Sequence, residues 1–163
     1  MCSSDLGHFE DFIFTKLTRF PRKARDVGDF RDDAPHHLLV LARQRHKKPA
    51  GRFTIVSLVW DAGQFSPVHG HYTWCAYMVR TGELLENAYR VDPASGRATV
   101  TATRGRRGGD GCFSFAGLDQ VHKLGNNTDR PAVSIHVYGL DGARVSTHVN
   151  RIVDKVSQEG TTQ

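Results

Sequence analysis

Residues 67–75 of the chain read PVHGHYTWC and contain two histidines, His69 and His71, two positions apart. Successive side chains of an extended strand point to opposite faces, so these two imidazoles project from the same face and could bind one metal ion. The alternative is a pair of ordinary polar side chains on an exposed strand. A single His-x-His pair is weak evidence, so its interpretation depends on the rest of the chain.

The length and composition of the chain limit the classes of protein to consider. With 163 residues, we expect a single domain over residues 1–163 with a substantial core. Hydrophobic residues make up 39%, and no apolar run approaches the roughly 20 residues that a membrane helix needs. The first residues lack the basic region and apolar core of a secretion signal. We therefore expect a cytoplasmic protein without a membrane partner.

The formal net charge of +5 raises the question of a nucleic-acid partner. The basic residues are spread out, with one cluster at residues 104–109. This cluster is either an RNA-contacting loop or a solvated hairpin tip. We favour the hairpin tip, and expect no nucleic-acid partner, because no aromatic side chains interleave with the arginines to stack on bases.

A pattern of short strands begins at Phe53. Residues 53–60 are rich in β-branched and aromatic side chains, which favour a strand. Further strand-like segments follow at residues 74–79, 83–90, 99–103, 113–115, 121–124 and 132–138. Glycine and proline turns separate them, and this arrangement is typical of an all-β sandwich or barrel. We expect the barrel to occupy residues 53–153.

The two ends of the chain carry other patterns. Apolar side chains between residues 9 and 17 have the spacing of one face of a short helix, which would end before Pro21. Residues 36–45 could form a second short helix or an edge strand. We expect residues 1–50 to be a helical and loop segment packed on the barrel, and residues 157–163 to be a flexible tail.

The residues around the histidine pair resemble the first cupin motif. Five residues separate Gly63 from His69, three separate His71 from Cys75, and six separate Cys75 from Gly82. Most cupins have a glutamate ligand at the place of Cys75. The resemblance implies an all-β, jelly-roll cupin barrel, here with short N-terminal helices.

A later segment resembles the end of the second cupin motif. His122 is followed, after three residues, by Asn126. The Pro-x-Gly that usually precedes this histidine is absent, because Gly117 and Asp119 occupy those places. His122 could also be an ordinary core histidine.

With the glutamate lost, the resemblance leaves three histidines, His69, His71 and His122, as the implied metal ligands. This set resembles the thiol dioxygenases, the family of cysteine dioxygenase and 3-mercaptopropionate dioxygenase. Residues 134–139, SIHVYG, are similar to the Ser-x-His-x-Tyr segment of that family. The resemblance covers roughly residues 53–138. It implies one Fe(II) per chain, and oxidation of a small thiol carboxylate with both atoms of dioxygen to the sulfinic acid.

The chemistry of these residues agrees with that implication. Ser134, His136 and Tyr138 alternate, so they share one face of a strand and can form a hydrogen-bonded relay that ends at the metal pocket. In this frame His136 is a partner of Tyr138 rather than a fourth ligand, and the alternative for Tyr138 is a core aromatic. Fe(II) suits imidazole ligands, and a facial set of three leaves positions open for substrate and dioxygen.

Cys75 has two interpretations. In mammalian-type cysteine dioxygenases a cysteine in this place forms a thioether with the catalytic tyrosine, so the resemblance implies a possible crosslink between Cys75 and Tyr138. The alternative is a small buried thiol that packs beneath the strand.

Binding of a substrate carboxylate calls for an arginine, whose planar guanidinium matches a carboxylate. By resemblance to cysteine dioxygenases the candidate is Arg43, although Leu41 stands where their Tyr-x-Arg pattern has the tyrosine. By resemblance to 3-mercaptopropionate dioxygenases the candidates are Arg144 and Arg151, which follow Tyr138. Each could also be a surface residue in a salt bridge.

Two other functional classes stay open. One is a non-catalytic cupin that binds a metal or a small ligand, and the other is a cupin enzyme of different chemistry, such as an isomerase or a ring-cleaving dioxygenase. The Ser134, His136 and Tyr138 relay favours the thiol dioxygenase, because a binding module has no need for it. The preferred thiol, cysteine or 3-mercaptopropionate, and the oligomeric state, monomer or weak dimer, also stay open.

Overall fold

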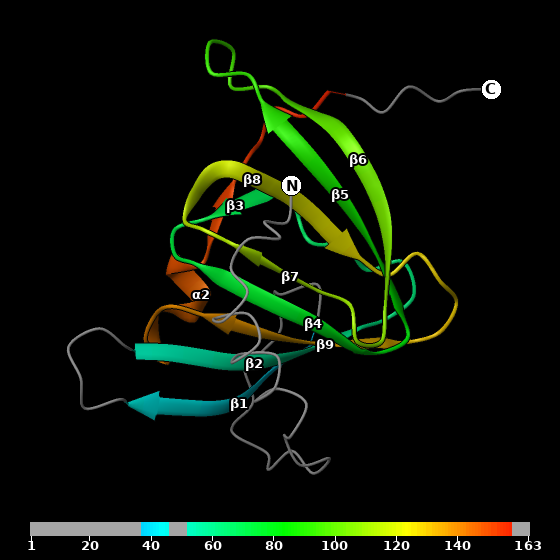
Figure 1. The fold of residues 1–163 in the computed structure, drawn as a ribbon, viewed down its shortest axis with the longest axis vertical. Coiled ribbons are helices and arrows are strands. Elements are labelled where there is room, and N and C mark those ends of the chain that lie inside the picture. The colour runs from blue at the N-terminus through cyan, green and yellow to red at the C-terminus, as the bar shows by residue number, and fades with distance from the viewer. Residues whose placement is uncertain (1–36, 46–51, 158–163) are drawn as a thin grey trace.

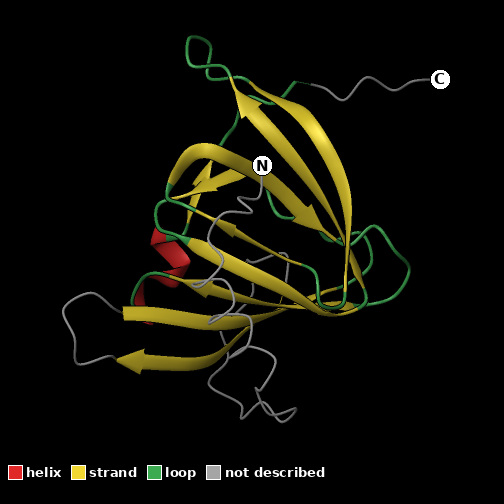
Figure 2. Cartoon of the chain, in the orientation of Figure 1, coloured by secondary structure: helices red, strands yellow, loops and turns green. Residues whose placement is uncertain are grey.

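The computed structural model describes residues 37–45 and 52–157, and within them nearly all regular structure is strand (Figure 2). The first sheet has the order β1-β2-β9-β4-β7. Its strands are β1 (His37–Arg45), β2 (Arg52–Trp60), β9 (Ala132–Tyr138), β4 (Cys75–Thr81) and β7 (Gly111–Ser114).

The second sheet has the order β10-β3-β8-β5-β6 and faces the first (Figure 1). Its strands are β10 (Asn150–Ile152), β3 (His69–His71), β8 (Gly117–Gly125), β5 (Glu83–Val91) and β6 (Ala98–Arg107). A 3-10 turn, η1 (Gly142–Arg144), and one turn of helix, α2 (Val145–His148), connect β9 to β10. Every pairing between these strands is antiparallel, and one isolated bridge, from Ala98 to Val156, is parallel. No helix of the described chain has the length and apolar character to cross a membrane.

The core between the sheets follows the two-residue period of a strand. Val56, Leu58 and Trp60 alternate along β2 and are at most 5% exposed, and they pack in one cluster with Leu84 of β5 and Leu124 of β8. The other face of the first sheet is also apolar, since Ile55 and residues of β4, β7 and β9 form a second cluster. Strands that are apolar on both faces explain the nearly continuous hydrophobic runs of β2 and β4.

Two glycines of the histidine motif are required by close backbone approaches. A Cβ atom on Gly70 would collide with the carbonyl oxygen of Gly117 on the neighbouring strand, so only glycine fits between the two histidines. Gly82 has a φ of 75°, which favours glycine, and a Cβ there would lie 2.8 Å from Cβ of Ala132. The spacing of the motif therefore reflects how tightly β3 and the β4–β5 turn pack.

The structure agrees with the predicted all-β cupin class and resolves one open alternative. Residues 37–45 form strand β1 at the edge of the first sheet, rather than a helix. The predicted N-terminal helix and residues 158–163 of the predicted tail lie outside the described residues. The basic cluster is only partly a hairpin tip, because β6 continues to Arg107 and the turn begins at Gly108.

Candidate metal centre

Three histidines meet on the inner side of the second sheet. His69 and His71 lie on β3, and His122 lies directly opposite His69 on β8. Side chains directly opposite in an antiparallel pair share a face and approach closely. The centroids of the three rings are 4.7–5.3 Å apart, and one nitrogen from each ring lies within 4.8 Å of the others. This geometry could hold a metal ion.

A hydrogen bond at Nδ1 orients each imidazole. His69 Nδ1 lies 2.9 Å from the carbonyl oxygen of Pro67, and His122 Nδ1 lies 2.9 Å from Oε1 of Glu86. His71 Nδ1 lies 3.2 Å from Oγ of Ser114, which itself donates to the carbonyl of Cys75 at 3.4 Å. All three partners can accept a proton from Nδ1, which leaves Nε2 as the nitrogen for an ion.

Burial favours the neutral, metal-binding form of the imidazole. His71 is 2% exposed, and this burial, together with the neighbouring rings of His122, His69 and His136, lowers the pKa of His71 to about 2. A histidine that stays uncharged keeps the lone pair that a metal ligand needs. The donor set and its surroundings therefore fit a divalent ion that accepts imidazole ligands.

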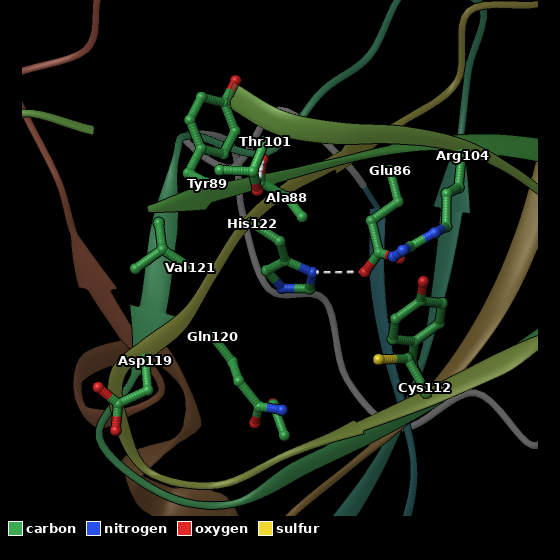
Figure 3. A pocket seen from close by; sticks show the side chains of 12 residues that line it. Glu86, Ala88, Tyr89, Thr101, Arg104, Cys112, Asp119, Gln120, Val121 and His122 are labelled. Carbon is green, nitrogen blue, oxygen red and sulfur yellow. Dashed lines mark hydrogen bonds and ion pairs between the residues drawn. The ribbon is translucent and has the colours of Figure 1, made fainter. Parts of the chain in front are cut away.

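A buried ion pair supports His122 through its Nδ1 atom. Glu86 on β5 is 5% exposed, and its second carboxylate oxygen accepts hydrogen bonds from Nε and Nη2 of Arg106 on β6. Although burial raises the pKa of Glu86, the hydrogen bond from His122 and the charge and hydrogen bonds of Arg106 lower it to about 2. Figure 3 shows His122 and Glu86 pointing toward each other at one wall of a cavity of about 510 Å³, including space open to solvent.

The predicted relay is present as a chain of hydrogen bonds, and it is longer than the sequence pattern indicated. Trp60 Nε1 donates to Oγ of Ser134 at 2.8 Å, and the same Oγ lies 2.8 Å from Nε2 of His136. His136 Nδ1 then lies 3.3 Å from the hydroxyl of Tyr138. Ser134, His136 and Tyr138 are all buried, so this chain is shielded from water.

His136 and Tyr138 of the relay line a second cavity together with the three histidines. This second cavity, about 350 Å³ including space open to solvent, is lined by His69, His71, His122, His136, Tyr138 and apolar side chains of Leu58 and Leu124. The ring of Tyr138 lies 6.4 Å from that of His71. A small molecule bound at the histidines would therefore lie beside the Tyr138 hydroxyl.

Cys75 and Tyr138 are directly opposite each other on β4 and β9, and both side chains pack in the same buried cluster. Cys75 is fully buried, and burial, with the charge of Glu86 adding to it, raises the pKa of the thiol. Burial likewise raises the pKa of Tyr138 well above its usual value. Both groups therefore stay protonated in the folded chain.

The structure treats the three candidate arginines differently. Arg151 lies opposite Gly70 on β10, so it shares the face of Gly70, which is the face opposite to the two histidines. Arg144 lies in η1 and is exposed. Neither lines the two cavities described above. The side chain of Arg43 is outside what the structure describes, but its backbone lies opposite Thr54, which lies opposite Tyr138.

Sequence reasoning missed Trp60, Ser114, Glu86 and Arg106. Trp60 and Ser114 each form a hydrogen bond to a residue far away in the chain, Ser134 and His71 respectively. No spacing in the local sequence predicts these contacts. Glu86 carried a usable signal, because a carboxylate at an inward position of the apolar strand β5 needs a buried partner.

Comparisons with known proteins agree with the fold and with the family resemblance. The sequence profile of the family described as cysteine dioxygenase type I matches residues 38–144. A cupin 2 conserved barrel domain protein from Salinispora arenicola is 20% identical, with a TM-score of 0.50 over 78% of this chain and 95% of that one. An oxalate oxidase is 17% identical, with a TM-score of 0.51 over 74% of this chain and 58% of that one. A mutant of Bacillus subtilis oxalate decarboxylase is 17% identical, with a TM-score of 0.50 over 70% of this chain and 28% of that one. Identities this low show the cupin fold alone, and this chain spans less than two thirds of the length of both oxalate enzymes.

Proposed function

Since the chain belongs to the cysteine dioxygenase type I family, we propose that it oxidises a small thiol carboxylate, cysteine or 3-mercaptopropionate, to the sulfinic acid. The family and the fold make it a metal-binding cupin dioxygenase. The proposal adds the substrate class, the product and the metal, one Fe(II) per chain held by His69, His71 and His122.

One observation carries the proposal most directly. Three oriented histidines and a tyrosine at the end of a buried hydrogen-bond chain line the same cavity. A module that only binds a metal would need the histidines but not the chain that leads to Tyr138. We therefore favour an enzyme over a binding protein.

The chain's own residues would hold the ion, exclude water and orient the substrate. Fe(II), when bound, would supply open positions for a thiol and dioxygen and would favour the thiolate form of the substrate. Leu58 and Leu124 line the cavity with apolar surface, which lowers the local dielectric constant and strengthens hydrogen bonds inside it. The three Nδ1 hydrogen bonds would keep the imidazoles in place during turnover.

The relay has a direction that follows from its donors. The indole N–H of Trp60 can only donate, so Oγ of Ser134 accepts this hydrogen bond. The Ser134 hydroxyl can then donate its own hydrogen bond to Nε2 of His136. Nδ1 of His136 then carries the proton and donates to the Tyr138 oxygen. The Tyr138 hydroxyl proton is left to donate toward Cys75 or toward a substrate in the cavity.

We propose Arg43 as the residue that binds the substrate carboxylate. The sheet register supports this choice, because Arg43, Thr54, Tyr138 and Cys75 lie in one row across β1, β2, β9 and β4. Tyr138, in the same row, lines the cavity of the three histidines. Arg144 and Arg151 have no comparable support.

The experiment that tests the proposal is oxygen uptake by the Fe(II)-loaded chain. The protein would be loaded under anaerobic conditions, and cysteine, 3-mercaptopropionate, cysteamine and a thiol-free carboxylate would be added in turn. We expect oxygen consumption with a thiol carboxylate and a product heavier by two oxygen atoms in mass spectrometry. No oxygen consumption with any thiol by iron-loaded protein would refute the proposal, and purified protein that holds only zinc or nickel would argue against oxygen chemistry.

A further inference from the structure

The ion pair of Glu86 with Arg106 needs an explanation beyond the fold. Both side chains are largely removed from water, with 6% and 14% of their surface exposed. Burying two charges is costly, and an apolar pair of similar volume is often as stable or more stable. The pair lies on neighbouring strands of one hairpin, where apolar residues would pack as well. Its position beside a candidate metal ligand suggests a different role.

We propose that Glu86, held in place by Arg106, is a positioning residue for the metal centre and acts through His122. One carboxylate oxygen accepts the proton of His122 Nδ1 at 2.9 Å, which fixes the tautomer and directs Nε2 toward the ion. The other oxygen is held by the guanidinium of Arg106, so the carboxylate cannot turn away. This inference rests on the proposed binding of a metal by the three histidines.

The Nδ1 partner of His122 differs in charge from the Nδ1 partners of His69 and His71 described above. His69 is oriented by a carbonyl and His71 by a hydroxyl, both neutral acceptors. The acceptor at His122 Nδ1 is instead a carboxylate, which carries a full negative charge. Because Cys75 stands where most cupins have a glutamate ligand, the three ligands are neutral and leave the charge of a divalent ion uncompensated. Glu86 supplies a buried negative charge next to that site.

The surroundings of the pair keep this charge effective. The ring of Tyr77 is 2% exposed and lies 6.3 Å from the ring of His122 and 5.3 Å from that of His136. It therefore packs between His122, the partner of Glu86, and His136 of the relay. In such a site, with little water, a charge is screened weakly and affects its neighbours more strongly than at the surface.

The test measures metal affinity rather than activity. Apparent dissociation constants for Co(II) and Zn(II) would be determined by competition with a chelator for the wild type, Glu86→Gln, and the double variant Glu86→Leu/Arg106→Leu. Glu83→Gln is a matched control, because Glu83 lies on the same strand and pairs with Arg107, whose side chain is 78% exposed. Ser114→Ala serves as a comparison for the loss of a neutral acceptor.

We expect Glu86→Gln and the double variant to bind metal about 10- to 100-fold more weakly than the wild type. A loss of this size is typical when the hydrogen-bond partner of a metal-bound histidine is removed. Ser114→Ala should lose less, and Glu83→Gln should match the wild type. The double variant should melt at or above the wild-type temperature without metal, which separates positioning from a role in folding. In the Zn(II)-loaded protein, the Glu86→Gln substitution should shift the ¹⁵N resonance of His122 Nδ1 more than those of His69 and His71.

Several outcomes would overturn the inference. Wild-type metal affinity in both Glu86 variants would reject it while leaving the proposed function in place. Equal losses of metal affinity in Glu86→Gln and Ser114→Ala would show that the charge of Glu86 has no effect of its own. That result would also reject the inference. If Glu86→Gln fails to fold, the double variant decides by the same measurement. A wild-type chain that binds no divalent ion would reject both the inference and the proposed function.

Discussion

Cys75 on β4 and Tyr138 on β9 lie directly opposite each other, and both side chains pack in the same buried cluster of the core. Neither strand has to move for the sulfur to approach the tyrosine ring, because opposite residues in an antiparallel pair have the shortest distance between side chains. The contact fits the thioether that the family resemblance implies, and it makes the crosslink testable.

We expect the Fe(II)-loaded chain to form this thioether slowly while it turns over a thiol with dioxygen. A carbon–sulfur bond replaces the S–H bond of Cys75 and one C–H bond of the Tyr138 ring, and dioxygen is the oxidant that takes up both hydrogens. Intact mass spectrometry should show a loss of two hydrogen atoms. Cys75→Ser and Tyr138→Phe should show no loss, and an unchanged wild-type mass after many turnovers would contradict the prediction.

The hydroxyl of Tyr138 should matter for the reaction and not for binding of the metal. Tyr138→Phe keeps the ring, so Fe(II) affinity should stay within about twofold, while kcat should fall by about 10²- to 10⁴-fold, the usual range for a positioned proton donor. Tyr72→Phe is the matched control, since Tyr72 is 60% exposed. Equal kcat values for the two variants would exclude Tyr138 from the chemistry.

Trp60 should act on Tyr138 through Ser134 and His136. Trp60→Phe removes the N–H that Ser134 accepts and also leaves a small cavity in the core, so it should cost at least about 1 kcal/mol of stability. If the chain of hydrogen bonds works as a unit, the losses of kcat in Trp60→Phe and Ser134→Ala will not add in the double variant. Additive losses would show that Trp60 acts independently of the relay.

The amount of the site that could be predicted from sequence depends on how local each pattern is. His69 and His71 share a face because they are two positions apart. Ser134, His136 and Tyr138 share a face for the same reason. Each set lies within one strand, so its spacing could be read from the local sequence. Pairing of distant strands brings Glu86 to His122 and Ser114 to His71. Nothing in the local sequence encodes such register, and the same reason explains why the strand at residues 37–45 could not be distinguished from a helix.

Gly70 should be essential for the geometry of the histidine pair. Gly70→Ala places a Cβ against the backbone oxygen of Gly117, which cannot move without shifting β8. We expect a loss of about 1–3 kcal/mol in stability, as for other overpacked sites, together with weaker metal binding. Gly108→Ala is the control, because a Cβ there meets its nearest atom at 3.4 Å. Thermal melting and chelator competition measure both effects, and equal behaviour of the two variants would contradict the prediction.

Arg43 should determine whether the enzyme prefers thiols that carry a carboxylate. A charge-assisted hydrogen bond contributes about 1.5–3 kcal/mol, so Arg43→Met should lower kcat/KM for cysteine or 3-mercaptopropionate by about 10- to 100-fold. Activity toward cysteamine, which has no carboxylate, should change little, because the thiol and the histidines are untouched. Arg151→Met should leave both substrates unaffected, since Arg151 shares the face of Gly70 and not that of the histidines. If Arg144→Met or Arg151→Met instead gives the selective loss, the carboxylate is bound from the segment after β9, and the row of residues that ends at Arg43 does not form the substrate site.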